Sequence, residues 1–183
     1  DFAGNLITMY LFYEFMTLTS LPLVLHTQTK EAVMAGLRYL FFSFAGAYMA
    51  LFGVYFICRY GTTLTFTAGG VIPAAVLQEH RTLFLVVTMC MLIGFGVKAG
   101  MFPLHAWLPA AHPVAPSPAS ALLSGTIVKF GALAVIRTVY YVVGPRFLRG
   151  TWVQYVWMVL ALLTVFMGSL LAYREPVLKK RLA

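Results

Sequence analysis

Long apolar runs constrain the fold of this chain more than any other feature of its sequence. About 20 mostly apolar residues cross the hydrocarbon core of a bilayer. Five runs reach or approach that length: residues 2–25, 39–58, from 82 onward, 119–141 and 152–173. A transmembrane β-barrel would instead show strands of alternating polarity. We therefore expect an all-α, polytopic transmembrane helical bundle of about five spans.

The composition agrees with a protein that is embedded in lipid. Of the 183 residues, 61% are apolar and 10% are charged, whereas soluble domains carry about 25% charged residues. The net charge of +8 does not indicate nucleic-acid binding, because no polar face is available to carry a basic patch. Cys58 and Cys90 lie inside apolar runs and offer neither a disulfide framework nor a metal-ligand spacing. We therefore expect neither a metal nor a cofactor on this chain.

Basic residues beside the apolar runs predict the orientation. We name the membrane side reached after the first run side B, and the opposite side A. Side B holds Lys30, Arg174, Lys179, Lys180 and Arg181, and side A holds Arg59, Arg81, Arg146 and Arg149. The positive-inside rule then places side B in the cytoplasm. Because the first residues already stand at a span and the last resemble the start of another helix, residues 1–183 are interpreted as a partial domain of a longer chain.

Two charged residues lie in the middle of apolar runs. Glu14 is about 12 residues into the first run, or about 18 Å at helical rise, and Lys129 has a similar depth in the fourth. Ionisable groups at such depth are functional candidates. An amine that is removed from water has a lowered pKa and can therefore exchange protons near neutral pH. The alternatives are a hydrogen-bonded structural acid for Glu14 and a fixed counter-charge for Lys129. Arg38, at the start of the second run, is a candidate partner for Glu14.

The third run predicts a broken helix near Lys98. The 32 residues from Arg81 to His112 are too many for one straight crossing, and Lys98 lies in the segment GFGVKAGMFP. Glycine and proline interrupt helices, and irregular backbone at membrane depth lies within protein or lines a wet cavity. Alternatively, Lys98 marks the interfacial end of a short span.

A proline-rich segment follows this break. We expect its prolines to impose an extended link before a helix that begins near residues 117–119, with Trp107 at the membrane interface. His105 and His112 are candidate proton relays, since imidazole titrates near neutrality. Each is alternatively a hydrogen-bonded loop histidine.

The middle of the chain resembles the antiporter-like proton-conducting subunits of complex I-type NADH:quinone oxidoreductases, Mrp antiporters and membrane-bound hydrogenases. The resemblance rests on residues 96–109, GVKAGMFPLHAWLP, on residues 112–125, HPVAPSPASALLSG, followed by Lys129, and on residues 12–18, FYEFMTL. It implies about fourteen helices in two inverted repeats, of which this chain covers the first repeat and the start of the second.

The resemblance also implies roles for single residues. Glu14 matches the glutamate that pairs with the broken-helix lysine, here Lys98, and Lys129 matches the lysine that passes the proton onward. Many members carry Trp-Leu-Pro-Asp, whereas this chain has Ala110 after Pro109. The broken helix of the second repeat, on the exit side of the family's proton route, is absent from this sequence.

The sequence therefore predicts proton translocation by an antiporter-like, non-redox subunit of an NADH:quinone oxidoreductase-like or hydrogenase complex. The expected partners are other membrane subunits, the remainder of its own chain and the lipid bilayer. The expected location is the prokaryotic cell (inner) membrane. The alternatives are an Mrp-type sodium/proton antiporter subunit and a structural membrane subunit without conduction; a solute carrier ranks last.

Overall fold

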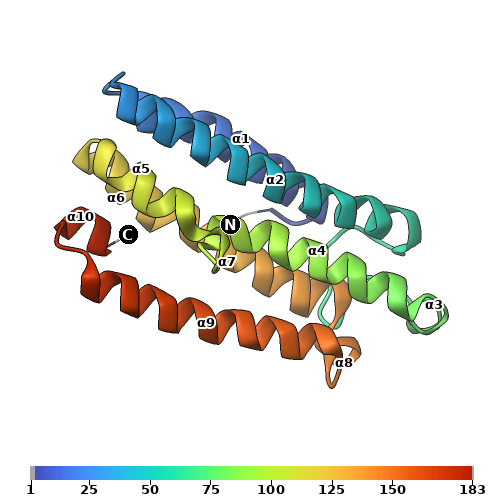
Figure 1. The fold of residues 1–183 in the computed structure, drawn as a ribbon. Coiled ribbons are helices and arrows are strands. Elements are labelled where there is room, and N and C mark those ends of the chain that lie inside the picture. The colour runs from blue at the N-terminus through green and yellow to red at the C-terminus, as the bar shows by residue number, and fades with distance from the viewer. Residues whose placement is uncertain (1–2, 183) are drawn as a thin grey trace.

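The computed structural model describes residues 3–182 as an elongated bundle of helices (Figure 1). Within the described residues, five helical segments are long and apolar enough to cross a membrane, and none of these residues forms a β-strand. The five segments are Leu6–Leu25, Lys30–Tyr60, Arg81–Val114, Ser117–Val143 and Trp152–Arg174. The all-α polytopic bundle is confirmed. Phe2, the expected start of the first span, lies outside the described residues.

The five segments and their connections comprise ten α-helices and three short helices of other types within residues 3–182. In chain order these are α1 (Leu6–Leu25), α2 (Lys30–Tyr60), α3 (Ala74–Glu79), α4 (Arg81–Ala99), the 3₁₀-helix η1 (Leu104–Trp107), α5 (Leu108–Val114), α6 (Ser117–Leu122), the π-helix η2 (Leu123–Ile127), α7 (Val128–Arg137), the π-helix η3 (Thr138–Val143), α8 (Pro145–Leu148), α9 (Trp152–Arg174) and α10 (Leu178–Leu182).

The second span begins earlier than its apolar run. The apolar runs end at residue 25 and resume at residue 39, but α2 starts at Lys30, so only residues 26–29 connect it to α1. The side chain of Thr29 accepts a hydrogen bond from the backbone N–H of Ala32 (3.2 Å), and Glu31 lies in the first turn. Both features stabilise a helix N-terminus, which explains why α2 begins before its apolar run.

The third span is broken next to Lys98, as expected. Helix α4 ends at Ala99, and the C-cap residue Gly100 has a φ of +78°, in the left-handed region that glycine adopts without steric cost. After Pro103 the chain continues as η1 and α5. The predicted extended link is confined to Ala115 and Pro116, because residues 104–114 are helical, and the next helix begins at Ser117, as expected. Pro109 fits into the first turn of α5, where no intrahelical N–H bond is required.

Glycines allow the central helices to pack at short range. A Cβ atom on Gly94 of α4 would lie 2.5 Å from the carbonyl oxygen of Gly46 in α2, and one on Gly131 of α7 would lie 2.5 Å from the backbone nitrogen of Ala99. Small residues of this kind let membrane helices approach backbone to backbone. The end of α4 is therefore held between α2 and α7.

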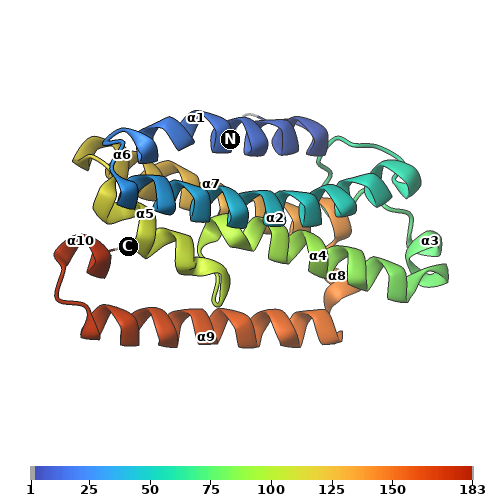
Figure 2. The ribbon, with the colours of Figure 1, turned by 45° about the horizontal axis from the view of Figure 1, so that its top comes forward.

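Helix α9 lies on the far side of α4 from α1 and α2 (Figures 1 and 2). Among its described residues only Val153 is buried. At its C-terminal end the chain turns back toward α5, and Lys179 donates a 3.4 Å hydrogen bond to the carbonyl of Ala115.

The link between α2 and α3 covers the side-A end of the bundle. Its backbone bonds to α1, where the N–H of Leu6 donates to the carbonyl of Leu64 (3.0 Å), and to η3, where the N–H of Val71 donates to Val142 (2.9 Å). Arg137 donates to the carbonyl of Ala3 (2.8 Å), and its guanidinium lies 5.1 Å from the ring centroid of Phe66. This loop therefore ties three spans together.

Candidate functional site

Lys98 occupies the last turn of α4, immediately before the break, and its relative exposure is 0%. The break itself is capped by backbone and side-chain donors. The N–H of Met101 donates to the carbonyl of Gly96 (3.0 Å), and Trp107 Nε1 donates to the carbonyl of Val97 (2.9 Å). Trp107 is fully buried, so its indole packs inside the bundle, and its expected depth at the membrane interface stays a prediction. Its indole satisfies a carbonyl that the broken helix leaves without an i+4 donor.

The ammonium of Lys98 crosses to α1. Lys98 Nζ donates to the backbone carbonyl of Tyr13 (2.7 Å) and to the hydroxyl of Thr17, and it lies 4.1 Å from the centroid of the Tyr13 ring. A carbonyl, a hydroxyl and an aromatic face all stabilise a cation. The position at the C-terminal end of α4 adds the negative end of the helix dipole. A charged lysine is therefore accommodated in a buried site.

Tyr13 joins the two helices at the same level. Its hydroxyl donates to the carbonyl of Gly94 (2.9 Å), and its ring meets Phe95 edge-on with centroids 5.3 Å apart. Tyr13 is completely buried. The side chain thus fixes the distance between α1 and the end of α4, and with it the place of the Lys98 ammonium.

Glu14 follows Tyr13 in α1 and is half-buried. Its carboxylate accepts a hydrogen bond from the Tyr10 hydroxyl (3.0 Å). Within the described residues no ion pair joins Glu14 to Lys98; the pair His80–Glu79 is the salt bridge found there. The two residues are nevertheless neighbours across the helices, because Lys98 bonds to the carbonyl of Tyr13, the residue before Glu14. The structure brings the two predicted residues to the same level, each with its own hydrogen-bond partner.

Lys129 and Arg38 lie outside this cluster. Both are exposed on the surface of the described chain. The neighbour of Arg38, Tyr39, contacts Ser20 (2.6 Å between the two hydroxyls), and Ser20 is six residues, or about 9 Å, further along α1 than Glu14. Among residues 3–182 no ion pair joins Arg38 to Glu14.

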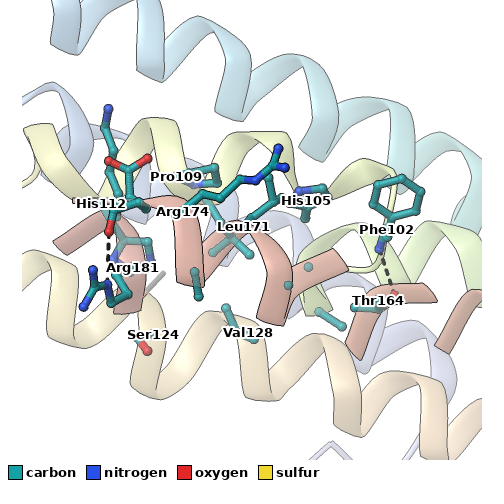
Figure 3. A pocket seen from close by; sticks show the side chains of 17 residues that line it. Phe102, His105, Pro109, His112, Ser124, Val128, Thr164, Leu171, Arg174 and Arg181 are labelled. Atoms are coloured by element: carbon teal, nitrogen blue, oxygen red, sulfur yellow. Dashed lines mark hydrogen bonds between the residues drawn. The ribbon is translucent and has the colours of Figure 1, made fainter. Parts of the chain in front are cut away.

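The two candidate histidines line one cavity of about 480 Å³ on the side-B half of the bundle (Figure 3). His112 is buried, and its Nδ1 lies 2.7 Å from the hydroxyl of Ser120. His105 stacks on Phe102 with centroids 5.5 Å apart, and its buried Nδ1 has no hydrogen-bond partner in the described structure. Both imidazoles therefore border the same cavity.

This cavity extends from the helix break to basic residues near side B. Ala99 and Gly100, which directly follow Lys98, line it, as do Arg174, Lys180 and Arg181. The N–H of Phe102 donates to Thr164 Oγ1 of α9 (3.0 Å), which links the break to the opposite wall (Figure 3). Within residues 3–182 no group of three or more His, Cys, Asp or Glu residues could hold a metal ion.

Sequence reasoning missed the residues that hold the charged groups in place: Tyr10, Tyr13, Thr17 and Ser120. Tyr10, Tyr13 and Thr17 follow each other at intervals of three and four, the spacing that puts side chains on one helix face. With Glu14 as a candidate on the same helix, this spacing could have identified the three residues from the sequence. The contact of Ser120 with His112 depends on the helical course of α5, which the prolines concealed.

The fold and site define a class: a helical membrane protein in which a broken helix presents a buried lysine to a glutamate-bearing neighbour. The chain matches the family model described as "NADH:quinone oxidoreductase/Mrp antiporter, TM" over residues 3–183. It belongs to this family, and the resemblance noted in the sequence is confirmed.

Similar proteins include members of several membrane complexes. Hydrogenase-4 component B of Escherichia coli (strain K12) is 34% identical over 171 residues, which are 93% of this chain and 25% of that protein. NADH-quinone oxidoreductase subunit N of Desulfitobacterium hafniense (strain DSM 10664 / DCB-2) is 30% identical over 183 residues, which are 99% of this chain and 36% of that protein.

Solved structures give the same picture. A chain of the membrane-bound sulfane sulfur reductase, an archaeal respiratory membrane complex, superposes with a TM-score of 0.82 at 26% identity. The match covers 98% of this chain and 36% of that one. The chain thus spans a quarter to about a third of the length of these relatives.

Proposed function

We propose that this chain is part of a proton-translocating, antiporter-like subunit, in which Lys98 holds the transferred proton under the control of Glu14. The single observation that carries the proposal is the buried Lys98 ammonium at a helix break, bonded to Tyr13 and Thr17 of the neighbouring span that also carries Glu14. Lys129 and the two histidines are the proposed onward and uptake groups. The family to which the chain belongs supports this assignment.

The control is Coulombic. Two unit charges about 4 Å apart at an effective dielectric near 20 interact by about 4 kcal/mol. That energy is large enough to decide whether a lysine keeps or releases its proton near neutral pH. Lys98 therefore holds its proton more firmly when Glu14 comes close than when Glu14 stays with Tyr10.

The cavity that borders Ala99 and Gly100 supplies the uptake side of this route. It reaches from the break past His105 and His112 to the basic residues near side B, which the positive-inside rule assigns to the cytoplasm. A proton would pass through water in the cavity, with the imidazoles as relays, and then reach Lys98. Ala110, where many family members have aspartate, leaves this route without that acid.

The cellular setting follows from the relatives. One is named as a hydrogenase component and one as a quinone oxidoreductase subunit, and the structural neighbour is part of a respiratory membrane complex. We infer that this subunit works with other membrane subunits in a prokaryotic cell membrane, and that redox chemistry belongs to those partners.

The test uses the full-length subunit in its complete complex, reconstituted into sealed vesicles. The driving reaction should acidify or alkalinise the vesicle interior in the wild type, and Lys98→Met should abolish or greatly reduce that proton movement. Lys98→Arg keeps the charge but resists deprotonation. It should also fail, because the proposal requires Lys98 to release a proton and not only to carry a charge. Undiminished proton movement in Lys98→Met would contradict the proposal.

Sodium exchange is the second candidate, because the family model includes Mrp antiporters. The same vesicles separate the two functions. Proton pumping continues in sodium-free buffer if protons are the transported ion, whereas an antiporter moves protons only against an imposed sodium gradient. Absence of both movements in the wild type would leave the structural-subunit alternative.

A further inference from the structure

Helix α1 offers Lys98 a ready-made binding position beside Glu14 and independent of it. Both hydrogen-bond acceptors of the ammonium, the Tyr13 carbonyl and the Thr17 hydroxyl, come from consecutive turns of α1. Tyr13 and Thr17 are each 0% exposed. The ammonium is thus held by two buried neutral groups and by the face of the Tyr13 ring.

The hydroxyl of Thr17 is arranged to accept. Thr17 Oγ1 donates its own hydrogen to the carbonyl of Tyr13 (3.3 Å). A hydroxyl has one donor and two acceptor positions, so this bond turns the oxygen lone pairs away from its own helix. Lys98 Nζ occupies one of those acceptor positions. The helix backbone therefore orients Thr17 as an acceptor for a cation.

Glu14 has a hydrogen-bond partner of its own. Its carboxylate accepts from Tyr10, one turn earlier on α1 (3.0 Å). The other titratable groups that face this region include Tyr13 on α1 and Tyr39 and Tyr48 on α2; Lys129, on the α7 side, is exposed. Within the described residues, the Lys98 ammonium of α4 thus lies against the stretch of α1 that carries Glu14 without forming an ion pair with it.

We propose that Thr17 is a positioning residue: with the Tyr13 carbonyl it holds the Lys98 ammonium away from Glu14 and so defines the open state of the pair. The inference rests on the proposed function, in which closing and opening of this pair governs whether Lys98 keeps its proton. Loss of the Thr17 acceptor then favours the closed pair. A hydrogen bond to a charged group is strong enough to shift the ratio of two such positions about tenfold.

The experiment compares three variants in the complete complex. Thr17→Val removes the hydroxyl at nearly constant shape, Thr17→Ser retains it, and Thr19→Val is the control. Thr19 lies on the same helix but is exposed, and its hydroxyl bonds to backbone carbonyls of α1, those of Phe15 (3.0 Å) and Met16 (3.3 Å). The two readouts are proton pumping per turnover and the Lys98–Glu14 distance from cryo-electron microscopy.

We expect Thr17→Val to bring Lys98 Nζ within about 4 Å of a Glu14 carboxylate oxygen, the usual ion-pair limit. Pumping should fall about tenfold, in line with the shifted ratio, while Thr17→Ser and Thr19→Val pump like the wild type. If Thr17→Val does not assemble, Thr17→Ala takes its place and is judged against Thr17→Ser.

Two results distinguish a failure of the proposed Thr17 role from a failure of the proposed function. Wild-type pumping in the Thr17 variant, with Lys98 still on the Tyr13 carbonyl, overturns the role of Thr17, provided that Lys98→Met abolishes pumping. Wild-type pumping in Lys98→Met overturns the proposed function itself. Equal loss in Thr17→Ser and Thr17→Val also counts against the inference, since the serine keeps the acceptor.

Discussion

Lys98 is a charged group whose surroundings can hold it with or without a counter-ion. In a buried site an amine loses the solvation of water, and this loss is compensated only by well-placed partners. Here a carbonyl, a hydroxyl, an aromatic face and the end of a helix dipole surround it. In the proposed function Glu14 acts as a variable partner of Lys98, which a proton switch requires and a fixed structural ion pair does not.

Glu14→Gln tests this freedom. The amide keeps the size of the side chain and an oxygen that accepts from Tyr10, but it removes the charge. Because Glu14 is half-buried and forms no ion pair in the described residues, the free energy of unfolding should change by less than about 1 kcal/mol. Pumping per turnover should fall several-fold.

The measurement compares the amount of assembled complex with the proton flux of the same preparation. Normal assembly with reduced flux supports an electrostatic role. Loss of the assembled protein would instead favour Glu14 as a structural acid, the alternative reading of its sequence position.

Trp107→Phe tests the cap on the broken helix. The change removes the Nε1–H bond to the Val97 carbonyl (2.9 Å) and leaves space at a fully buried position. We expect a loss of about 1–3 kcal/mol in stability, seen as faster thermal inactivation of the solubilised complex. Trp152, which is 45% exposed, gives the control Trp152→Phe, and equal inactivation rates for the two variants would argue against the cap.

At the scale of elements, the apolar runs predicted the number of spans and the break, because lipid selects for length and hydropathy. They did not predict where helices extend into water. The start of α2 at Lys30 depends on the Thr29 cap, and the helical course of α5 depends on prolines that fit its ends. Local capping determined these boundaries, and hydropathy carries no information about it.

The close approach of α2 and α4 makes Gly94 the critical contact between these elements. A Cβ there would lie 2.5 Å from the Gly46 carbonyl oxygen and 2.7 Å from the Ala50 nitrogen, both backbone atoms that cannot rotate away. Gly94→Ala should therefore cost about 1–3 kcal/mol through overpacking and lower the yield of assembled subunit.

Gly125→Ala is the matched control for this substitution. Gly125 also lies within a span, but a Cβ there meets nothing within 4 Å, so we expect wild-type yield. Immunoblots of membrane fractions measure both variants. Equal yields would show that the backbone contact at Gly94 is not required for packing.

For the whole molecule, the sequence located Glu14, Lys98 and the two histidines, but not their relation. Charge in an apolar run identifies Glu14 and Lys98, because lipid rarely tolerates such groups without a function. Hydroxyl and carbonyl groups of Tyr10, Tyr13 and Thr17 bond to Glu14 or Lys98, and we propose that they keep the pair apart, although they are ordinary residues of a membrane helix. Only the packing of α1 on α4 reveals their role.

The predicted orientation, with side B in the cytoplasm, determines which loops should reach the cytoplasm. Thr27, between α1 and α2, and Ala68, between α2 and α3, are exposed at opposite ends of α2. In a background with Cys58 and Cys90 replaced by serine, a membrane-impermeant maleimide added to intact cells should label Ala68→Cys and spare Thr27→Cys. Permeabilised cells should show both labels. The reverse pattern would place side A in the cytoplasm.

The most direct test of the central claim is the number of protons moved per turnover of the driving reaction, measured in sealed vesicles that contain equal amounts of assembled complex. With Lys98→Met, the account predicts that the reaction continues while this number falls by the whole contribution of the subunit. An unchanged number of protons per turnover would contradict the claim that Lys98 carries the proton.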